Sequence, residues 1–184
     1  MGLQKVSPTN HIKVSRQEAL ELEINIMNVT QITKYEEGFS HTPYLCSAGF
    51  VTIGYGTKLH KSKGLNPKDF PIRVSYRMAE EWLSSEIQTK ERSLQASSRH
   101  TAYRNLSLDR KAVILTMAYQ LGTRGVLNFT KMWTALHAGE YGRAADEMLD
   151  SRWAVQTRGR ALRLAEVMSG EELSHVYQDR VGSW

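Results

Sequence analysis

The sequence has little cysteine and proline, and it lacks a long hydrophobic run. A single cysteine in 184 residues cannot form a disulfide within the chain, which excludes a disulfide-stabilised secreted scaffold. The most apolar run, Ala112–Leu121, covers roughly ten residues, which is too short for a bilayer and predicts a buried helix. Residues 1–13 lack the apolar core of a secretory signal, so we expect neither a leader nor a stable membrane anchor.

The excess of basic residues is mild. The chain has 24 Lys and Arg against 19 Asp and Glu, which gives a formal net charge of +5. This balance predicts an anionic partner, and nucleic acid, a membrane surface and a cell-wall polymer all remain open. Hydrophobic residues make up 41% of the chain and charged residues 23%, which is ordinary for a globular protein of one domain or two small lobes.

The N-terminal part of the chain predicts a long helix. Ser15 and Glu18 form a capping box at its start, and residues 1–14 before it are polar and aperiodic, so we expect a flexible extension there. Apolar residues then recur at helical spacing in two sets, which predicts a wide buried stripe. The sets are Leu20, Ile24 and Met27, and Leu22, Ile26 and Val29.

The rest of the chain predicts a small lobe with a little sheet and a larger helical lobe. Four glycines interleaved with β-forming residues predict short strands over 38–57, followed by a loop over 58–74. From residue 107 the pattern is helical, with expected breaks at Gly122, Gly125, Gly139 and Gly142. Ser169 and Glu172 predict a second capping box before the last helix.

The predicted fold class is therefore α+β, mainly α, with a cleft between the two lobes. Its parts are the extension (1–14), an N-terminal helix and small lobe with a short antiparallel sheet (15–75), a long connecting helix (76–95) and an all-helical lobe (96–184).

Three residues of the small lobe form the most informative pattern. Glu37 stands before a glycine, Cys46 follows nine residues later, and Thr52 follows six residues after that. A hairpin carrying Cys46 and Thr52 would fold back beside the helix end, so that all three side chains converge on one cleft. Taken singly, they are more often a solvated carboxylate, a small buried hydrophobe and an ordinary strand residue, and it is their combination with Gly49, Gly54 and Gly56 that favours a site.

The same pattern resembles the bacteriophage lysozymes of the T-even type, glycoside hydrolase family 24. That family has a Glu before a Gly, then an Asp or Cys, then a Thr before Ile-Gly-x-Gly, and Glu37, Cys46 and Thr52 match this spacing without a gap. Further matching segments follow in the family's order, and together they cover roughly residues 30–168. They are Arg110–Gly122, Gly125–Thr130, Ser151–Thr157 and Arg160–Ala161.

The resemblance implies a lysozyme, an N-acetylmuramidase that hydrolyses the β-1,4 bond between N-acetylmuramic acid and N-acetylglucosamine. That reaction needs an acid to protonate the leaving oxygen and a group on the other face of the sugar. Glu37 is implied as the acid, with Cys46 and Thr52 positioning or activating water. A Cys46 thiolate acting as base, a thiolate attacking the sugar, and a thiol that only helps Thr52 to hold water all remain open.

Other roles follow from the resemblance alone. Arg160 is implied to pair with Glu37, and Arg163 with Glu36, from one face of a helix. Three further residues correspond to the family's saccharide cleft as substrate-binding positions. They are Tyr119, Gln120 and Arg152.

The implied partner is bacterial peptidoglycan, and nucleic acid is not expected. The histidines are scattered without the spacing of a metal site, so neither a metal nor a cofactor is predicted. The resemblance implies a monomeric endolysin that lyses the host cell. It would stay in the host cytoplasm until a separate holin releases it to the periplasm or cell wall.

Two alternatives remain open. A lytic transglycosylase uses a single Glu and makes an anhydro sugar end without water. A catalytically inert wall-binding or virion structural protein on the same fold would bind cell wall without releasing sugar.

Overall fold

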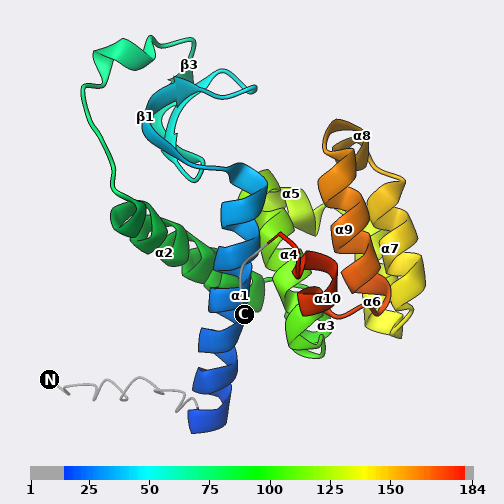
Figure 1. Cartoon of the computed structure of the whole chain (residues 1–184). Helices are drawn as coiled ribbons and strands as arrows, with labels where there is room; N and C mark the ends of the chain where they lie inside the picture. The colour runs from blue at the N-terminus through cyan, green and yellow to red at the C-terminus, as the bar shows by residue number, and fades with distance from the viewer. Residues whose placement is uncertain (1–14, 181–184) are drawn as a thin grey trace, which may run out of the picture.

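The computed structural model describes residues 15–180, and the predicted extension 1–14 lies outside this range. A small three-stranded sheet stands at one end of the molecule and most of the helices gather at the other, as Figure 1 shows. This is the predicted α+β, mainly helical arrangement of a lysozyme-like fold.

The small lobe is built on an antiparallel sheet. Its strands are β1 (Ser40–Leu45), β2 (Phe50–Gly54) and β3 (Thr57–Lys63), and β2 lies between the other two. The predicted loop over 58–74 was wrong for its first part, because β3 continues to Lys63. The residues of β3 are mostly lysine, histidine and serine and largely exposed, so this edge strand lacks the apolar alternation that signals a strand.

The connecting helix α2 (Tyr76–Gln95) spans the predicted residues. The Ser75 side chain accepts a hydrogen bond from the amide of Met78 and caps its first turn. Buried Ala79, Leu83, Ile87 and Leu94 then follow one face of the helix into the core. At the start of this face, Gly54 of β2 packs so closely that a side chain there would meet Ala79.

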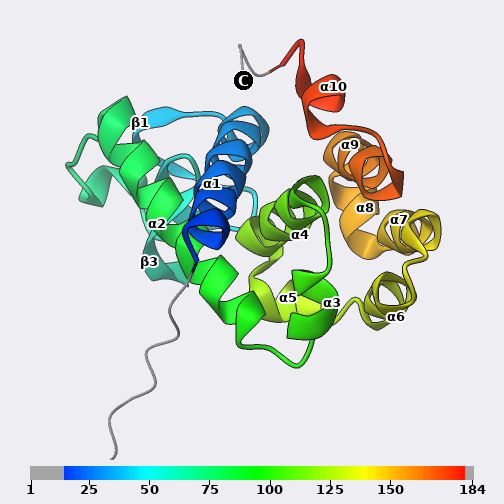
Figure 2. The same cartoon turned by 90° about the horizontal axis from the view of Figure 1, so that it is seen from below.

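The helical lobe surrounds α4 (Leu108–Leu121). Every residue from Ala112 to Ala118 is buried, as the apolar run predicted, and Figure 2 shows α4 between the α1–α2 pair and the outer helices. Gly125 and Gly142 lie inside helices, so the breaks predicted at these two glycines were wrong. The other helices of the lobe are α3 (His100–Arg104), α5 (Thr123–Leu127), α6 (Thr130–Ala138), α7 (Tyr141–Leu149), α8 (Arg152–Gln156), α9 (Arg158–Ser169) and α10 (Leu173–Tyr177).

The N-terminal helix α1 (Arg16–Glu37) is continuous, and only its second half is well buried. Val29 and Ile32 are fully buried. One predicted apolar set was wrong, because Leu20, Ile24 and Met27 are 51%, 37% and 54% exposed. The first half of α1 extends beyond the body of the molecule, away from the helices that would cover it (Figure 1). No helix within residues 15–180 is long and apolar enough to cross a membrane.

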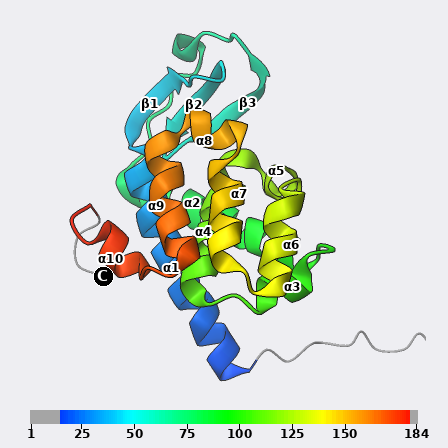
Figure 3. The ribbon, with the colours of Figure 1, turned by 90° about the vertical axis from the view of Figure 1, so that its right-hand side faces the viewer.

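The start of α10 is capped from another helix. The predicted box was wrong, because Ser169 ends α9 and its hydroxyl donates to the carbonyl of Glu166. The amide of Leu173 instead donates to the Asp109 carboxylate on α4, at 3.0 Å. Figure 3 shows α10 at the edge of the molecule, beside α9 and α1.

Candidate active site

Glu37 is the last residue of α1 and is held from the opposite lobe. Gly38 follows it with φ +65°, a left-handed conformation that suits glycine and ends the helix. Arg160 Nη1 on α9 donates to Glu37 Oε1 at 2.7 Å. The other oxygen, Oε2, lies against Gly56, where an added Cβ would stand only 3.4 Å away. One carboxylate oxygen is therefore fixed, and the other faces the β2–β3 turn.

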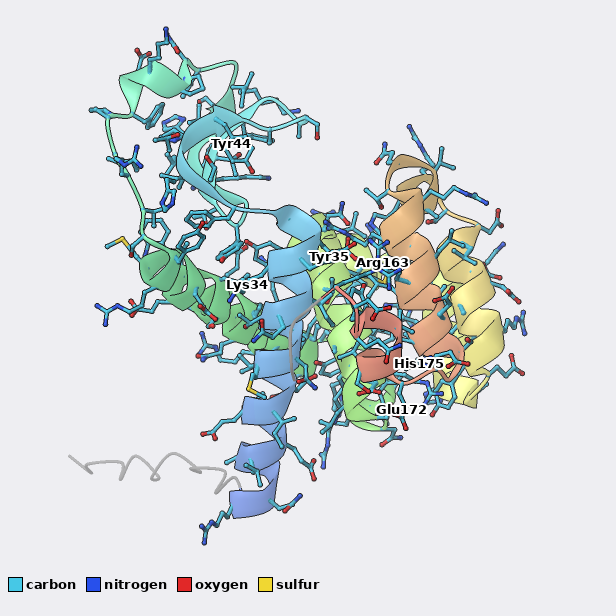
Figure 4. All side chains as sticks on the ribbon, in the orientation of Figure 1. Lys34, Tyr35, Tyr44, Arg163, Glu172 and His175 are labelled. Carbon is cyan, nitrogen blue, oxygen red and sulfur yellow. The ribbon has the colours of Figure 1, made fainter. Side chains whose placement is uncertain are left out.

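The neighbouring Glu36 is the centre of a buried charge network. Its side chain is 5% exposed and accepts hydrogen bonds from Arg160 Nε at 3.2 Å, from Arg163 at 2.8–3.0 Å and from the Tyr177 hydroxyl at 2.9 Å. Arg160 Nη2 also donates to the Glu36 carbonyl at the helix end, at 2.7 Å. Figure 4 shows Arg163 beside Tyr35, and its guanidinium lies 5.4 Å from the ring centroid.

Both pairings implied by the sequence are present, and Arg160 bonds Glu36 as well as Glu37. The contribution of Tyr177 was not predicted, because it lies in the C-terminal segment that the resemblance does not cover. The Glu36 hydrogen bond and burial raise the pKa of Tyr177, with burial the larger cause, so the phenol stays a donor to the carboxylate. The network ties the end of α1 to α9 and α10.

The hairpin of β1 and β2 places Cys46 and Thr52 close together. Cys46 follows β1, and its amide donates to the Phe50 carbonyl at 3.0 Å. The same carbonyl accepts the Thr52 hydroxyl, also at 3.0 Å. Gly49 closes the turn with φ +82° and donates to the Cys46 carbonyl at 2.8 Å. Thr52 is 2% exposed, whereas Cys46 is half-buried.

The surroundings of Cys46 favour its thiolate. Burial raises the pKa of the thiol, but the other contacts outweigh it and the pKa lies below its ordinary value. These contacts are hydrogen bonds with the Thr52 side chain and with the backbone at Phe50 and Ala48, and the positive charge of Lys58. At neutral pH a larger share of Cys46 is therefore ionised than of a free cysteine.

Tyr44 links the two parts of the site. It lies directly opposite Thr52 in the β1–β2 register. Its pKa is raised, first by burial and then by the negative charges of Glu37 and Cys46. One phenol therefore lies close enough to Glu37 and Cys46 to feel the negative charge of both groups. We did not predict Tyr44, although its position two residues before Cys46 on a strand gave a signal.

Two of the three predicted substrate-binding residues use their polar atoms inside the protein. The Tyr119 hydroxyl donates to the Tyr55 carbonyl in the β2–β3 turn at 2.6 Å, and burial is the largest cause of its raised pKa. Gln120 Oε1 accepts from Trp153 Nε1 at 2.7 Å. Arg152 is exposed at the start of α8. Tyr119 therefore supports the turn that contains Gly56, and Arg152 lies apart from it.

Arg152 lines a cavity of about 430 Å³ on the helical lobe. Phe129, Met132 and Trp153 form part of its apolar wall, and Glu147 adds a carboxylate. Glu37 is not among its lining residues. Within residues 15–180, no three His, Cys, Asp or Glu side chains gather in a group that could hold a metal ion.

A mainly helical chain, a three-stranded sheet and a glutamate clamped between the lobes define the class of lysozyme-like proteins. Residues 34–166 match the family model "Phage lysozyme". The chain belongs to the phage lysozyme family.

Curated relatives agree at modest identity. "Probable T4-type lysozyme 1" of Dictyostelium discoideum is 27% identical over 162 residues, covering 78% of this chain and 94% of the relative. "Probable T4-type lysozyme 2" of the same organism is 26% identical over 159 residues, covering 77% and 94%. "Pre-baseplate central spike protein Gp5" of Enterobacteria phage T4 is 25% identical over 158 residues, covering 77% of this chain but 28% of the spike protein.

Proposed function

We propose that this protein is an N-acetylmuramidase that hydrolyses the β-1,4 bond between N-acetylmuramic acid and N-acetylglucosamine in bacterial peptidoglycan. One observation carries the proposal: Arg160 of the helical lobe holds Glu37 Oε1 at 2.7 Å, while Oε2 faces the turn that follows the strand of Thr52. Glu37 supplies the acid, and the hairpin of Cys46 and Thr52 supplies the water-activating group. Family membership supplies the substrate class. Glycoside hydrolysis by two such groups is the chemistry that this arrangement suits best.

Glu37 acts as the general acid in this proposal. Its protonated carboxyl gives a proton to the leaving glycosidic oxygen as the bond breaks. Arg160 holds Oε1, so the proton is delivered from Oε2, which faces Gly56. The arginine fixes the carboxyl group and joins the lobes.

Cys46 and Thr52 act on the attacking water. The Cys46 thiolate takes a proton from the water while the oxygen bonds to the anomeric carbon, and the configuration inverts. Thr52 helps to place the water, since its hydroxyl lies beside the thiol. The rate should then rise with pH between about 6 and 9, and alkylation of Cys46 should abolish activity. Full activity after alkylation would exclude a thiolate.

The remaining residues of the site bind the saccharide or support the residues that do. In this proposal Arg152 contacts the saccharide from the helical lobe, Gln120 fixes Trp153, and Tyr119 holds the β2–β3 turn. Acting as a monomer, the enzyme would serve as an endolysin that waits in the host cytoplasm for a holin and then lyses the cell.

A virion structural role is the second candidate. It is favoured by the similarity to one part of a protein named as a baseplate central spike. In that case the protein would be a component of a larger assembly, and it would bind the cell wall without releasing sugar.

Mass spectrometry of digested peptidoglycan tests these alternatives. The wild type, Glu37→Gln and a matched control, Glu81→Gln on the exposed face of α2, are compared after their melting temperatures are checked. Reducing muramic acid ends from wild type and control, but not from Glu37→Gln, are expected. Anhydro-muramic ends would indicate a lytic transglycosylase. Wall binding without products from any variant would favour the structural role.

A further inference from the structure

Three side chains form a row across the sheet beside Cys46. Tyr44 of β1 is paired with Thr52 of β2, and Thr52 is paired with Lys58 of β3. Residues directly opposite each other in antiparallel strands project from the same face, and their Cβ atoms lie about 5 Å apart. Lys58 therefore projects from the face of the sheet that carries Thr52.

The Phe50 ring holds the Lys58 ammonium in place. Lys58 Nζ lies 4.3 Å from the ring centroid and Lys63 Nζ lies 5.1 Å from it. The register shifts between Phe50 and Thr52, which brings both lysines to the same ring. The carbonyl of Phe50 also binds the Cys46 amide and the Thr52 hydroxyl. Phe50 thus contacts Lys58 through its ring, and the Cys46 backbone and the Thr52 hydroxyl through its carbonyl.

The local sequence leaves these lysines without nearby acidic neighbours along the chain. Residues 38–68 contain four lysines and neither Asp nor Glu. Tyr44 on β1 and Lys58 on β3 interact electrostatically with Cys46, and Lys63 on β3 lies beside Gly49 in the turn after Cys46. Glu37 acts on Tyr44, and Lys58 is the charged side chain that acts on the thiol.

We propose that Lys58 is a positioning residue of the active site, whose ammonium favours the thiolate of Cys46. The inference rests on the proposed function, in which that thiolate takes a proton from water. The water oxygen bonds to the anomeric carbon, the glycosidic bond breaks, and Glu37 protonates the leaving oxygen. Cys46 ends as a thiol and Glu37 as a carboxylate, and both return to their starting states by exchange with solvent.

The effect of Lys58 is modest and depends on salt. Lys58 is exposed, so water and ions screen its charge. A single charge several ångströms away in such surroundings changes an ionisation constant on the order of threefold to fivefold at low salt. At 1 M salt the screening length is about 3 Å, and the effect should almost vanish.

The test follows alkylation of the single cysteine by iodoacetamide between pH 6 and 10 in the full chain. The variants are Lys58→Met, which keeps an apolar stem over Phe50, Lys58→Arg, and the matched control Lys61→Met on the same strand. At pH 7 and low salt we expect Lys58→Met to react three to five times more slowly. Lys58→Arg and Lys61→Met should react like the wild type, and 1 M salt should remove the difference. The shift of the Cys46 ionisation to higher pH in Lys58→Met should also appear in the pH profile of kcat.

Equal rates in Lys58→Met and wild type, or an equal loss in Lys61→Met, would overturn the proposal. Melting temperatures show whether Lys58→Met is folded, and the Arg variant separates loss of charge from loss of packing. The alkylation rates report on the coupling of Lys58 to Cys46 whether or not sugar is released. Failure of the muramidase proposal would appear separately, as a wild type without products.

Discussion

Replacement of Arg160 by Ala should reduce both stability and turnover. The guanidinium donates to Glu37 Oε1 at 2.7 Å, to Glu36 Oε2 at 3.2 Å and to the Glu36 carbonyl at 2.7 Å. It thereby joins α9 to the end of α1, about 120 residues away along the chain. Its removal leaves Glu37 without a fixed position and leaves one helix-end carbonyl without its donor.

The magnitude follows from burial. The side chains of Arg160, Glu36 and Glu37 are 9%, 5% and 23% exposed. Breaking a buried ion pair by removing one partner costs about 3–5 kcal/mol. Arg163 still neutralises Glu36, so we expect a loss of about 3 kcal/mol, at the lower end of that range. For a chain of this size, that lowers the melting temperature by about 6–12 °C.

Urea and thermal unfolding followed by circular dichroism measure the loss, and turnover of peptidoglycan is measured on the same samples below the melting temperature. Arg158→Ala, an exposed position at the start of the same helix, is the matched control and should stay within about 0.5 kcal/mol of wild type. Arg160→Lys keeps the charge but loses the planar, two-pronged guanidinium, so its loss of stability should lie between those of Arg158→Ala and Arg160→Ala. Wild-type melting together with wild-type turnover in Arg160→Ala would refute the reasoning.

Two further predictions use other parts of the fold. Gly56→Ala should lower kcat, because its Cβ would stand 3.4 Å from Glu37 Oε2. The control Gly64→Ala has a comparable positive φ but open space around its Cβ, so both variants should lose about 1 kcal/mol in unfolding experiments. An equal drop in kcat in the two variants would contradict a specific effect on Glu37. Asp109→Ala should speed amide hydrogen exchange of Leu173 and lower the free energy of unfolding by about 1 kcal/mol. Asp109→Asn keeps an acceptor and should behave like wild type. Unchanged exchange of Leu173 in the Ala variant would count against the cap.

The sequence predicted the features that repeat locally or match a family pattern. The long connecting helix predicted over 76–95 is present as α2. The pairing of Arg160 with Glu37 joins distant residues, and only the family resemblance indicated it. The α+β layout followed from the change between a glycine-rich segment with β-formers and long helical patterns.

Features that depend on tertiary contacts were beyond sequence reasoning. Leu20 and Met27 have helical spacing, but they lie where α1 extends past its neighbours, so they stay exposed. Ser169 stands at a plausible capping spacing, yet the cap of α10 comes from Asp109, 64 residues away. Tyr177 binds Glu36 from outside the segment that carries the resemblance. Local periodicity cannot report which other segment will cover or bind a residue.

The charges of the site divide into two systems, one at the end of α1 and one on the sheet. On the α1 side, Arg160 and Arg163 bind two adjacent carboxylates and fix their geometry. On the sheet side, Lys58 favours an anion on a thiol, a group that is mostly neutral at pH 7. Tyr44 feels the negative charges of both Glu37 and Cys46, so its phenol couples the two systems electrostatically.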